Sequence, residues 1–479
     1  MDSNDPSKNL NGGLYRPPAP IPKPARNKPL SLPRQIMAIP AVLGNPLELL
    51  RQDVFSKPHV QSSFLGQHTT TLSDPEAIRH CLVENASNYR MHPLRQIMFK
   101  RILREGLLTA EGAHWKRSRH MMSPLFAARN IENFTVSMRD TVERGLPKLL
   151  GSKRPNSSVH MGEVMTRLTY NVLSDALFSG DLSEDEEEMV RLVAVILNSL
   201  GKPDPLDILG MPSYVPRMTK TRGIRAVRKF RRMVKNTSQT RVEKIKASEA
   251  VPQDFLTLLL SQRDKEGLAL THREIEDEMV TFIGAGHETT AQALTWLLFL
   301  LSKDPESRLR VEAEVDGLDM KTLAPNDWGQ KLPWTIACFE ETLRLYPPAS
   351  LLLRQAIDED KFGEIIIPAG GNLSINLWVL HRHNTLWEQP NVFNPDRFYG
   401  AARNQIGRFQ YLPFGAGHRT CIGAQFAMKE AAILIACLIK KFRFEYVDEI
   451  EPTPIIRLSL QPDNGMPMKV TPRGKTCNS

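Results

Sequence analysis

The stretch of sequence that decides the fold is Phe414-Gly415-Ala416-Gly417-His418-Arg419-Thr420-Cys421-Ile422-Gly423. Its glycines allow sharp backbone turns and let backbone N–H groups approach the cysteine sulfur. An almost wholly apolar helix is predicted from Ala424 to Ile439, so Cys421 lies at a helix N-terminus, whose partial positive charge favours a thiolate. A structural cysteine does not require this ten-residue pattern, and a phosphate loop would end in Gly-Lys-Ser/Thr. The stretch therefore predicts a metal-ligating thiolate.

A second motif lies in the middle of a long predicted helix. Thr271-His272-Arg273-Glu274 is a capping box, and the helical pattern runs from there to Lys303, roughly 50 Å. At its centre stands Gly284-Ala285-Gly286-His287-Glu288-Thr289-Thr290, whose glycines each cost about 1 kcal/mol relative to alanine. The helix alone leaves two explanations open: close approach of a planar group beside a proton-delivering Glu-Thr pair, or a packing groove with Thr bonded back to its own helix.

A pair of opposite charges lies three residues apart on a third predicted helix. Glu341 and Arg344 share one face of an otherwise apolar stretch that Pro347-Pro348 ends. An exposed pair is the commoner case, but the apolar setting favours burial, and buried charges need partners.

Together, in this order, these motifs resemble the cytochrome P-450 family over nearly the whole chain from about residue 40. The cysteine stretch matches F-x-x-G-x-R-x-C-x-G, and the helix centre matches A/G-G-x-D/E-T-T. The resemblance implies haem b with Cys421 as the axial thiolate ligand, Phe414 shielding the sulfur, and Gly415 turning the loop beneath the haem. It also implies that Glu288 and Thr289 relay protons to bound dioxygen.

The resemblance further assigns side chains that surround the haem. Residues implied to hold the propionates are Trp115, Arg119, Arg354 and Arg419. The segment Pro395-Asp396-Arg397-Phe398 matches the family's P-x-R-F, so Glu341, Arg344 and Arg397 are expected to form a structural triad behind the haem.

The implied activity is that of a monooxygenase inserting one oxygen atom from O2 into an apolar organic substrate. A haem-thiolate isomerase or dehydratase needs no electrons, and a non-catalytic haem sensor needs no proton relay, so the intact Glu288-Thr289 pair argues against both. Substrate-facing stretches implied by the resemblance are Asn88–Leu108, Leu200–Arg217, the face around Ala285, and Ala349–Leu353. The last of these, ASLLL, favours a lipid-, terpenoid- or aromatic-like substrate.

Electrons are expected from a separate ferredoxin or flavodoxin, because the 479 residues contain no flavin or iron–sulfur domain. A net charge of +9 suits an acidic carrier. Docking is expected near Cys421, at the basic residues Lys116, Arg117, His418 and Lys429.

The organisation predicted is one catalytic domain over residues 40–479 after an extended, proline-rich segment over 1–39, with an α+β, mainly α fold. One hairpin is expected from Glu364–Pro368 to Asn372–Leu380, and another within Leu458–Met468. The basic cluster Arg222–Lys235 is expected to be a solvated helix face, not a nucleic-acid site. Five scattered cysteines, no apolar run of 18 residues and no signal peptide predict a soluble, cytoplasmic protein without a membrane span.

Overall fold

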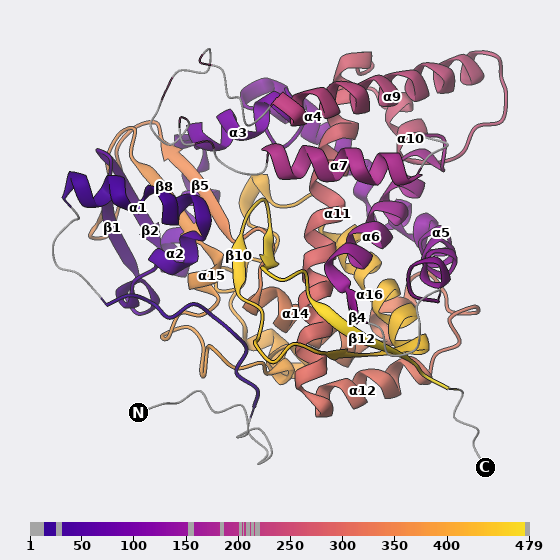
Figure 1. The fold of residues 1–479 in the computed structure, drawn as a ribbon. Helices are drawn as coiled ribbons and strands as arrows, with labels where there is room; N and C mark the ends of the chain where they lie inside the picture. The colour runs from indigo at the N-terminus through magenta and orange to yellow at the C-terminus, as the bar shows by residue number, and fades with distance from the viewer. Residues whose placement is uncertain are drawn as a thin grey trace.

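The computed structural model describes residues 14–24, 31–151, 158–182, 186–200, 204, 206, 211, 215 and 221–474. Helices form the larger part, and the main sheet lies to one side of them (Figure 1). The longer helices are α1 (Leu32–Gly44), α3 (Pro93–Leu103), α4 (Gly112–Met122), α5 (Ala128–Leu146), α6 (Met161–Phe178), α7 (Glu186–Leu200), α9 (Thr221–Lys246), α11 (His272–Lys303), α12 (Pro305–Asp316), α14 (Pro333–Leu345) and α16 (Ala424–Lys441). The shorter ones are α2 (Pro75–Arg79), α10 (Phe255–Ser261), α13 (Asp327–Gln330) and α15 (Leu377–Leu380).

The strands are short and form small sheets. They are β1 (His59–Phe64), β2 (Gln67–Leu72), β3 (Tyr89–Met91), β4 (Ser158–His160), β5 (Leu351–Ala356), β6 (Asp360–Phe362), β7 (Ile365–Ile367), β8 (Asn372–Asn376), β9 (Phe442–Tyr446), β10 (Pro454–Ile456), β11 (Leu460–Pro462) and β12 (Pro467–Pro472). The largest sheet has the order β1-β2-β8-β5-β3, and β2 and β8 are parallel. The α+β, mainly α prediction is confirmed.

Both predicted hairpins contain real strands that pair with other partners. Strand β7 pairs with β6, whereas β8 pairs with β5 and β2, and Leu377–Leu380 forms helix α15 instead of continuing the strand. Strand β11 pairs with β10, and β12 pairs with β4 and β9. Strand pairing depends on neighbours that are distant in sequence, which a local pattern does not contain.

Helix α11 runs through the middle of the helical part, as the sequence predicts (Figure 1). The Thr271 Oγ1 accepts a hydrogen bond from the Glu274 N–H at 3.2 Å, and the Thr271 N–H donates to the Glu274 carboxylate at 2.7 Å. The predicted capping box is therefore formed. Helices α6, α14 and α16 pack against α11 and bury most of its length.

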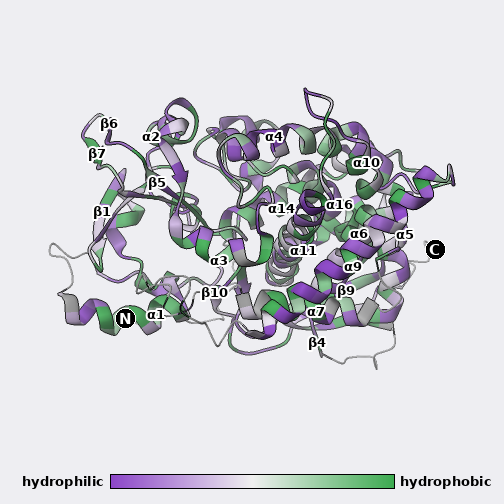
Figure 2. Cartoon of the chain, turned by 90° about the horizontal axis from the view of Figure 1, so that it is seen from above, coloured by the Kyte–Doolittle hydropathy of each residue, from purple (hydrophilic) through white to green (hydrophobic). Residues whose placement is uncertain are grey.

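Apolar residues concentrate on α11, α14 and α16 in the interior, while hydrophilic residues recur along the peripheral α9 (Figure 2). Arg222, Arg225 and Arg232 are exposed there, which agrees with a solvated face. Arg231 differs, because it is buried and its guanidinium donates to the Asp277 carboxylate of α11 at 2.5 Å. None of the described helices is long and apolar enough to cross a membrane.

The proline-rich segment is extended over residues 14–24, but helix α1 begins at Leu32, so the chain does not stay extended to residue 39. A proline in the first turn, here Pro33, is compatible with a helix start because that N–H needs no partner. The extended part packs on the domain: the Tyr15 hydroxyl donates to Glu451 at 2.6 Å, and the Tyr346 hydroxyl donates to the Pro18 carbonyl at 2.9 Å. A boundary at residue 40 therefore coincides with no structural break.

Candidate functional site

The cysteine loop connects an irregular segment to α16. The Cys421 N–H donates to the Phe414 carbonyl at 2.8 Å and closes the loop. Gly415 and Gly417 have φ of 72° and 71°, which L side chains rarely adopt. A Cβ on Gly417 would lie 2.0 Å from the Leu82 carbonyl oxygen, so this position accommodates only glycine. Close contact with the Leu82 backbone therefore fixes one side of the loop.

The sulfur of Cys421 lies just before the first turn of α16, which begins at Ala424. Although Cys421 is exposed to solvent, the protein around the sulfur desolvates it and raises the pKa of the thiol. The Gly423 N–H and the Arg119 guanidinium act in the opposite direction by stabilising the thiolate. Desolvation outweighs these two contributions, so the helix N-terminus expected from the sequence does not by itself create a thiolate.

Arginines gather beside this loop. Arg119 donates to the Thr420 carbonyl at 3.0 Å, and Arg419 donates to the Ala110 carbonyl at 2.8 Å. The Arg419 guanidinium also lies 4.2 Å from the centre of the Trp115 ring. Burial lowers the pKa of Arg354, and burial together with the nearby Arg354 charge lowers that of Arg419 to about 10.

Arg95 on α3 is a member of this cluster that the sequence analysis missed. Burial and repulsion from Arg354 and Arg419 lower the pKa of Arg95 to about 10. The sequence assigned its helix to the substrate wall, and no local motif marks an arginine there as part of a charge cluster. A group of partly buried guanidinium groups whose charges oppose each other fits an anionic group such as a pair of propionates.

The centre of α11 contains both features that the sequence left open. A Cβ on Gly286 would lie 2.7 Å from the Leu173 side chain of α6, so this glycine permits close helix packing. The Thr289 hydroxyl donates to the Ala285 carbonyl at 3.0 Å, within its own helix. Ala285, however, is exposed in the middle of a helix that is otherwise mostly buried. That exposure is compatible with a planar group lying against the helix.

Glu288, the neighbour of Thr289, is 9% exposed. Its Oε1 accepts hydrogen bonds from the Ser459 hydroxyl at 3.0 Å and the Gln292 amide at 3.2 Å. Ser459 was not singled out in the sequence, because its contact with Glu288 joins positions 171 residues apart.

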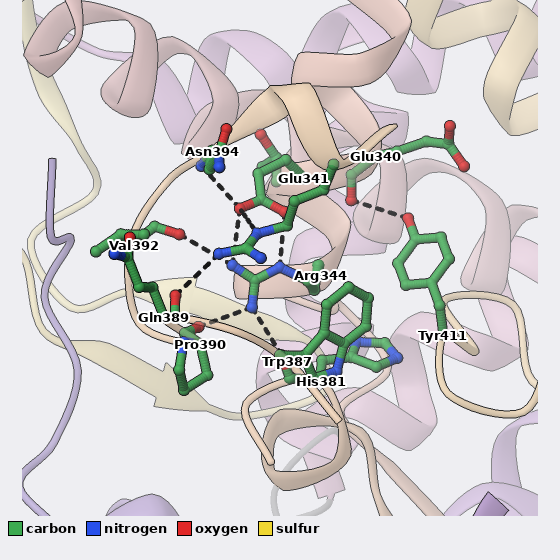
Figure 3. A network of polar contacts seen from close by, with 12 residues as sticks. Glu340, Glu341, Arg344, His381, Trp387, Gln389, Pro390, Val392, Asn394 and Tyr411 are labelled. Carbon is green, nitrogen blue, oxygen red and sulfur yellow. Dashed lines mark hydrogen bonds and ion pairs between the residues drawn. The ribbon is translucent and has the colours of Figure 1, made fainter. Parts of the chain in front are cut away.

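The structure also brings Glu341, Arg344 and Arg397 together, and Figure 3 shows the contact between Glu341 and Arg344. Glu341 and Arg344 have no exposed side-chain surface and form two hydrogen bonds of 2.6 and 2.7 Å. The Arg397 Nε lies 3.6 Å from Glu341 Oε1, and the Asn394 N–H donates to the same oxygen at 2.9 Å. The carboxylate is thus surrounded by donors, as a buried charge requires.

Comparison with known proteins gives a consistent result. A family model described as cytochrome P-450 matches residues 44–469. The chain belongs to the cytochrome P-450 family. It is 31% identical over 406 residues to a cytokinin hydroxylase of Arabidopsis thaliana, covering 84% of this chain and 78% of that protein. It is 30% identical over 393 residues to cyclooctatin synthase of Streptomyces melanosporofaciens, covering 81% of this chain and 83% of that protein.

The fold of this cytochrome P-450 is also that of a solved relative. The haem domain of cytochrome P-450DA superposes with a TM-score of 0.80 at 22% identity, covering 96% of this chain and 99% of that one. The protein is a haem-thiolate monooxygenase, and the predictions of family, haem cofactor and enzyme class are confirmed. When bound, the haem supplies the redox-active iron at which dioxygen is reduced.

A cleft of about 660 Å³ adjoins the cysteine loop of this cytochrome P-450, with Arg403, Arg408, Phe414, Thr420, Ala424 and Lys429 among its lining residues. Cys421 is not one of them. Of the basic residues expected at a docking face, Lys116 and His418 are exposed. Arg117 instead pairs with Asp264 at 2.7 Å and Glu274 at 2.6 Å. Lys429 is partly buried and donates to the Pro325 carbonyl at 2.5 Å. Arg117 and Lys429 are therefore engaged within the protein.

Proposed function

We propose that this cytochrome P-450 holds its haem through the Cys421 thiolate and oxygenates an apolar organic substrate. The observation that carries the proposal is the arginine cluster beside the cysteine loop. Positive charges that repel one another and are partly desolvated are costly, and a dianionic cofactor edge would compensate them. Bound iron would likewise compensate the desolvation that raises the pKa of the Cys421 thiol.

The roles of the neighbouring side chains follow from this arrangement. Side chains that would hold the propionates are Trp115, Arg119, Arg354, Arg419 and, in addition, Arg95. Phe414 would cover the sulfur, and Gly415, whose φ is 72°, would provide the turn beneath the ring. Glu341, Arg344 and Arg397 hold the segments behind the haem together.

Glu288 and Thr289 form the proton relay of the proposed mechanism. The Thr289 hydroxyl, bonded to the Ala285 carbonyl, can donate toward the exposed face of α11 by rotating about one bond. Glu288 can exchange a proton through the oxygen that does not bond Ser459 and Gln292. A fixed acid and hydroxyl of this kind accelerate steps that need protons at a reduced oxygen.

The proposed substrate is lipid-, terpenoid- or aromatic-like. The wall Ala349–Leu353 is apolar, and Leu351 in it is 39% exposed. The names of two relatives, a cytokinin hydroxylase and a cyclooctatin synthase, are compatible with an organic substrate but do not specify one.

The electron donor is proposed to be a separate ferredoxin or flavodoxin in the cytoplasm. Its acidic surface would meet the cleft beside the cysteine loop, where Arg408 and, on α4, Lys116 are exposed. These charges replace Arg117 and Lys429 as the main docking positions.

The test is a set of cysteine variants. Cys421→Ala should lose the red-shifted Soret band of the reduced CO complex. Cys338→Ala and Cys437→Ala, which replace fully buried cysteines elsewhere, should retain it. A normal band in Cys421→Ala would overturn the proposed ligand and the function built on it.

A further inference from the structure

The side chain of Glu288 is held by a residue near the C-terminal end of the sequence. Ser459 lies between β10 and β11 and is 1% exposed. Its hydroxyl donates to Glu288 Oε1 at 3.0 Å. The second bond to that oxygen comes from Gln292, one turn further along α11, at 3.2 Å. The contact therefore links the hairpin of β10 and β11 directly to Glu288, the acid of the proposed proton relay.

The position of the Ser459 hydroxyl is set by the backbone of the hairpin. The Arg457 N–H donates to the Ser459 carbonyl at 3.0 Å and closes the turn. The Leu460 N–H donates to the Pro348 carbonyl at 3.0 Å, and the Asn45 amide donates to the Pro454 carbonyl at 3.0 Å. With anchors on both strands, the hydroxyl has little freedom to leave the carboxylate.

We propose that Ser459 is a positioning residue for proton delivery, which holds the Glu288 side chain in place. The inference rests on the proposed role of Glu288 in the relay. Among the described residues, both bonds end on Oε1, so Oε2 is the oxygen left to take up and pass on a proton.

The titratable groups around this site do not donate a hydrogen bond to the Glu288 side chain in the described part of the chain. His287, adjacent on α11, donates its Nδ1–H to the Ile283 carbonyl, and its ring contacts the Tyr170 ring of α6 edge-on. Burial lowers the pKa of His287, so its ring is neutral near pH 7. On α16, burial raises the pKa of Glu430 to about 8, and that carboxyl group bonds Thr290. Among the described residues, Ser459 and Gln292 are thus the donors that hold the Glu288 side chain.

The hairpin also contacts the segment proposed to face the substrate. Pro348, which accepts the Leu460 N–H, directly precedes the apolar wall Ala349–Leu353. The hairpin of β10 and β11 therefore contacts both Glu288 and the residue that precedes the apolar wall.

The test measures the hydrogen bonding of the Glu288 side chain directly, in the ferric holoenzyme without substrate. Infrared difference spectra between the wild type and Glu288→Gln identify the carboxyl or carboxylate band that belongs to Glu288, and the frequency of that band depends on the hydrogen bonds to its oxygens. This control is needed because other buried carboxyl groups, Glu278 and Glu430 among them, absorb in the same spectral region. Ser459→Ala should shift the frequency of the Glu288 band, because one of the two hydrogen bonds to Oε1 is lost.

A matched pair of variants isolates the hydroxyl. Ser459→Thr keeps it and should restore the wild-type frequency, whereas Ser459→Val, which has the shape of threonine without the hydroxyl, should behave like Ser459→Ala. The same pair decides the question if Ser459→Ala loads too little haem. A wild-type frequency in Ser459→Ala or Ser459→Val would overturn the proposal. Failure of the relay would show separately, as unchanged coupling of electrons to product in Glu288→Gln.

Discussion

Removal of the Arg344 side chain is the perturbation whose cost the structure defines best. Its guanidinium makes two bonds to Glu341, of 2.6 and 2.7 Å, and both side chains are fully buried. It also donates to the carbonyls of His381, Pro390 and Val392 at 2.8, 2.7 and 3.0 Å (Figure 3). Arg344→Ala would leave a buried carboxylate and three carbonyl groups without this donor.

The expected loss is large relative to the stability of a domain. Breaking a buried ion pair by removing one partner costs about 3–5 kcal/mol. Each lost neutral hydrogen bond adds about 1 kcal/mol where water does not replace it. Glu341 would retain the Asn394 N–H at 2.9 Å and Arg397 at 3.6 Å, which limits the loss. Because total stabilities are about 5–15 kcal/mol, a loss of this size removes a large fraction of the stability of the domain.

Urea denaturation followed by tryptophan fluorescence, together with haem content per chain, measures this effect. Arg344→Lys keeps the charge but cannot form the two parallel hydrogen bonds to Glu341. Its urea midpoint should therefore lie between those of the wild type and Arg344→Ala. Arg79→Ala removes an exposed pair with Glu76 and should leave the midpoint unchanged. A haem-loaded Arg344→Ala with the wild-type midpoint would refute the argument from burial.

The remaining predictions concern the site and its surroundings. Thr289→Ala should bind haem and consume electrons but release more peroxide per electron, and unchanged coupling would contradict its relay role. Gly417→Ala should lose haem, because its Cβ would lie 2.0 Å from the Leu82 carbonyl oxygen. Gly180→Ala is the control: Gly180 also has a positive φ, 84°, but a Cβ there would have no atom within 4 Å, so this variant should keep its haem. Equal haem contents in the two variants would contradict the clash at Gly417. Burial raises the pKa of Glu278 to about 8 from 4.5, so the native state retains a proton that the unfolded chain releases. The contribution of Glu278 to stability should therefore fall by up to about 1.4 kcal/mol per pH unit from pH 4.5 to 8. The urea midpoints of Glu278→Gln should fall less steeply with pH than those of the wild type, because only the similar contribution of Glu430 remains. Lys116→Glu should slow reduction by an acidic ferredoxin in stopped-flow measurements, and salt should slow wild type; insensitivity to both would place docking elsewhere.

Local sequence patterns were sufficient to predict the helices that carry the candidate site. The capping box at Thr271 and the start of α16 at Ala424 both lie where the sequence predicts them. The acid and base of Glu341 and Arg344 are one helical turn apart, so their contact was predictable from spacing. Helix bonds and caps join residues within about four positions, and a sequence window contains all of the participants.

Long-range contacts were not predictable in the same way. The two expected hairpins contain real strands with other partners, such as β8 between β2 and β5. Arg117 was expected on an open docking face, but Asp264 and Glu274 engage it. In each case the sequence identified the strand or the basic side chain correctly, but it did not identify the segment or the residues that this element contacts.

The sequence by itself determined the cysteine loop, the glycine-containing centre of α11, the apolar helix that buries Glu341 and Arg344, and through them the family. These features depend on turns, spacing and polarity along one segment. The tertiary structure alone decided that Arg95 joins the arginine cluster and that Ser459 bonds Glu288. Those contacts join segments brought together when the apolar core is buried, and the strengths of charges and hydrogen bonds there depend on desolvation that exists only after the chain has folded.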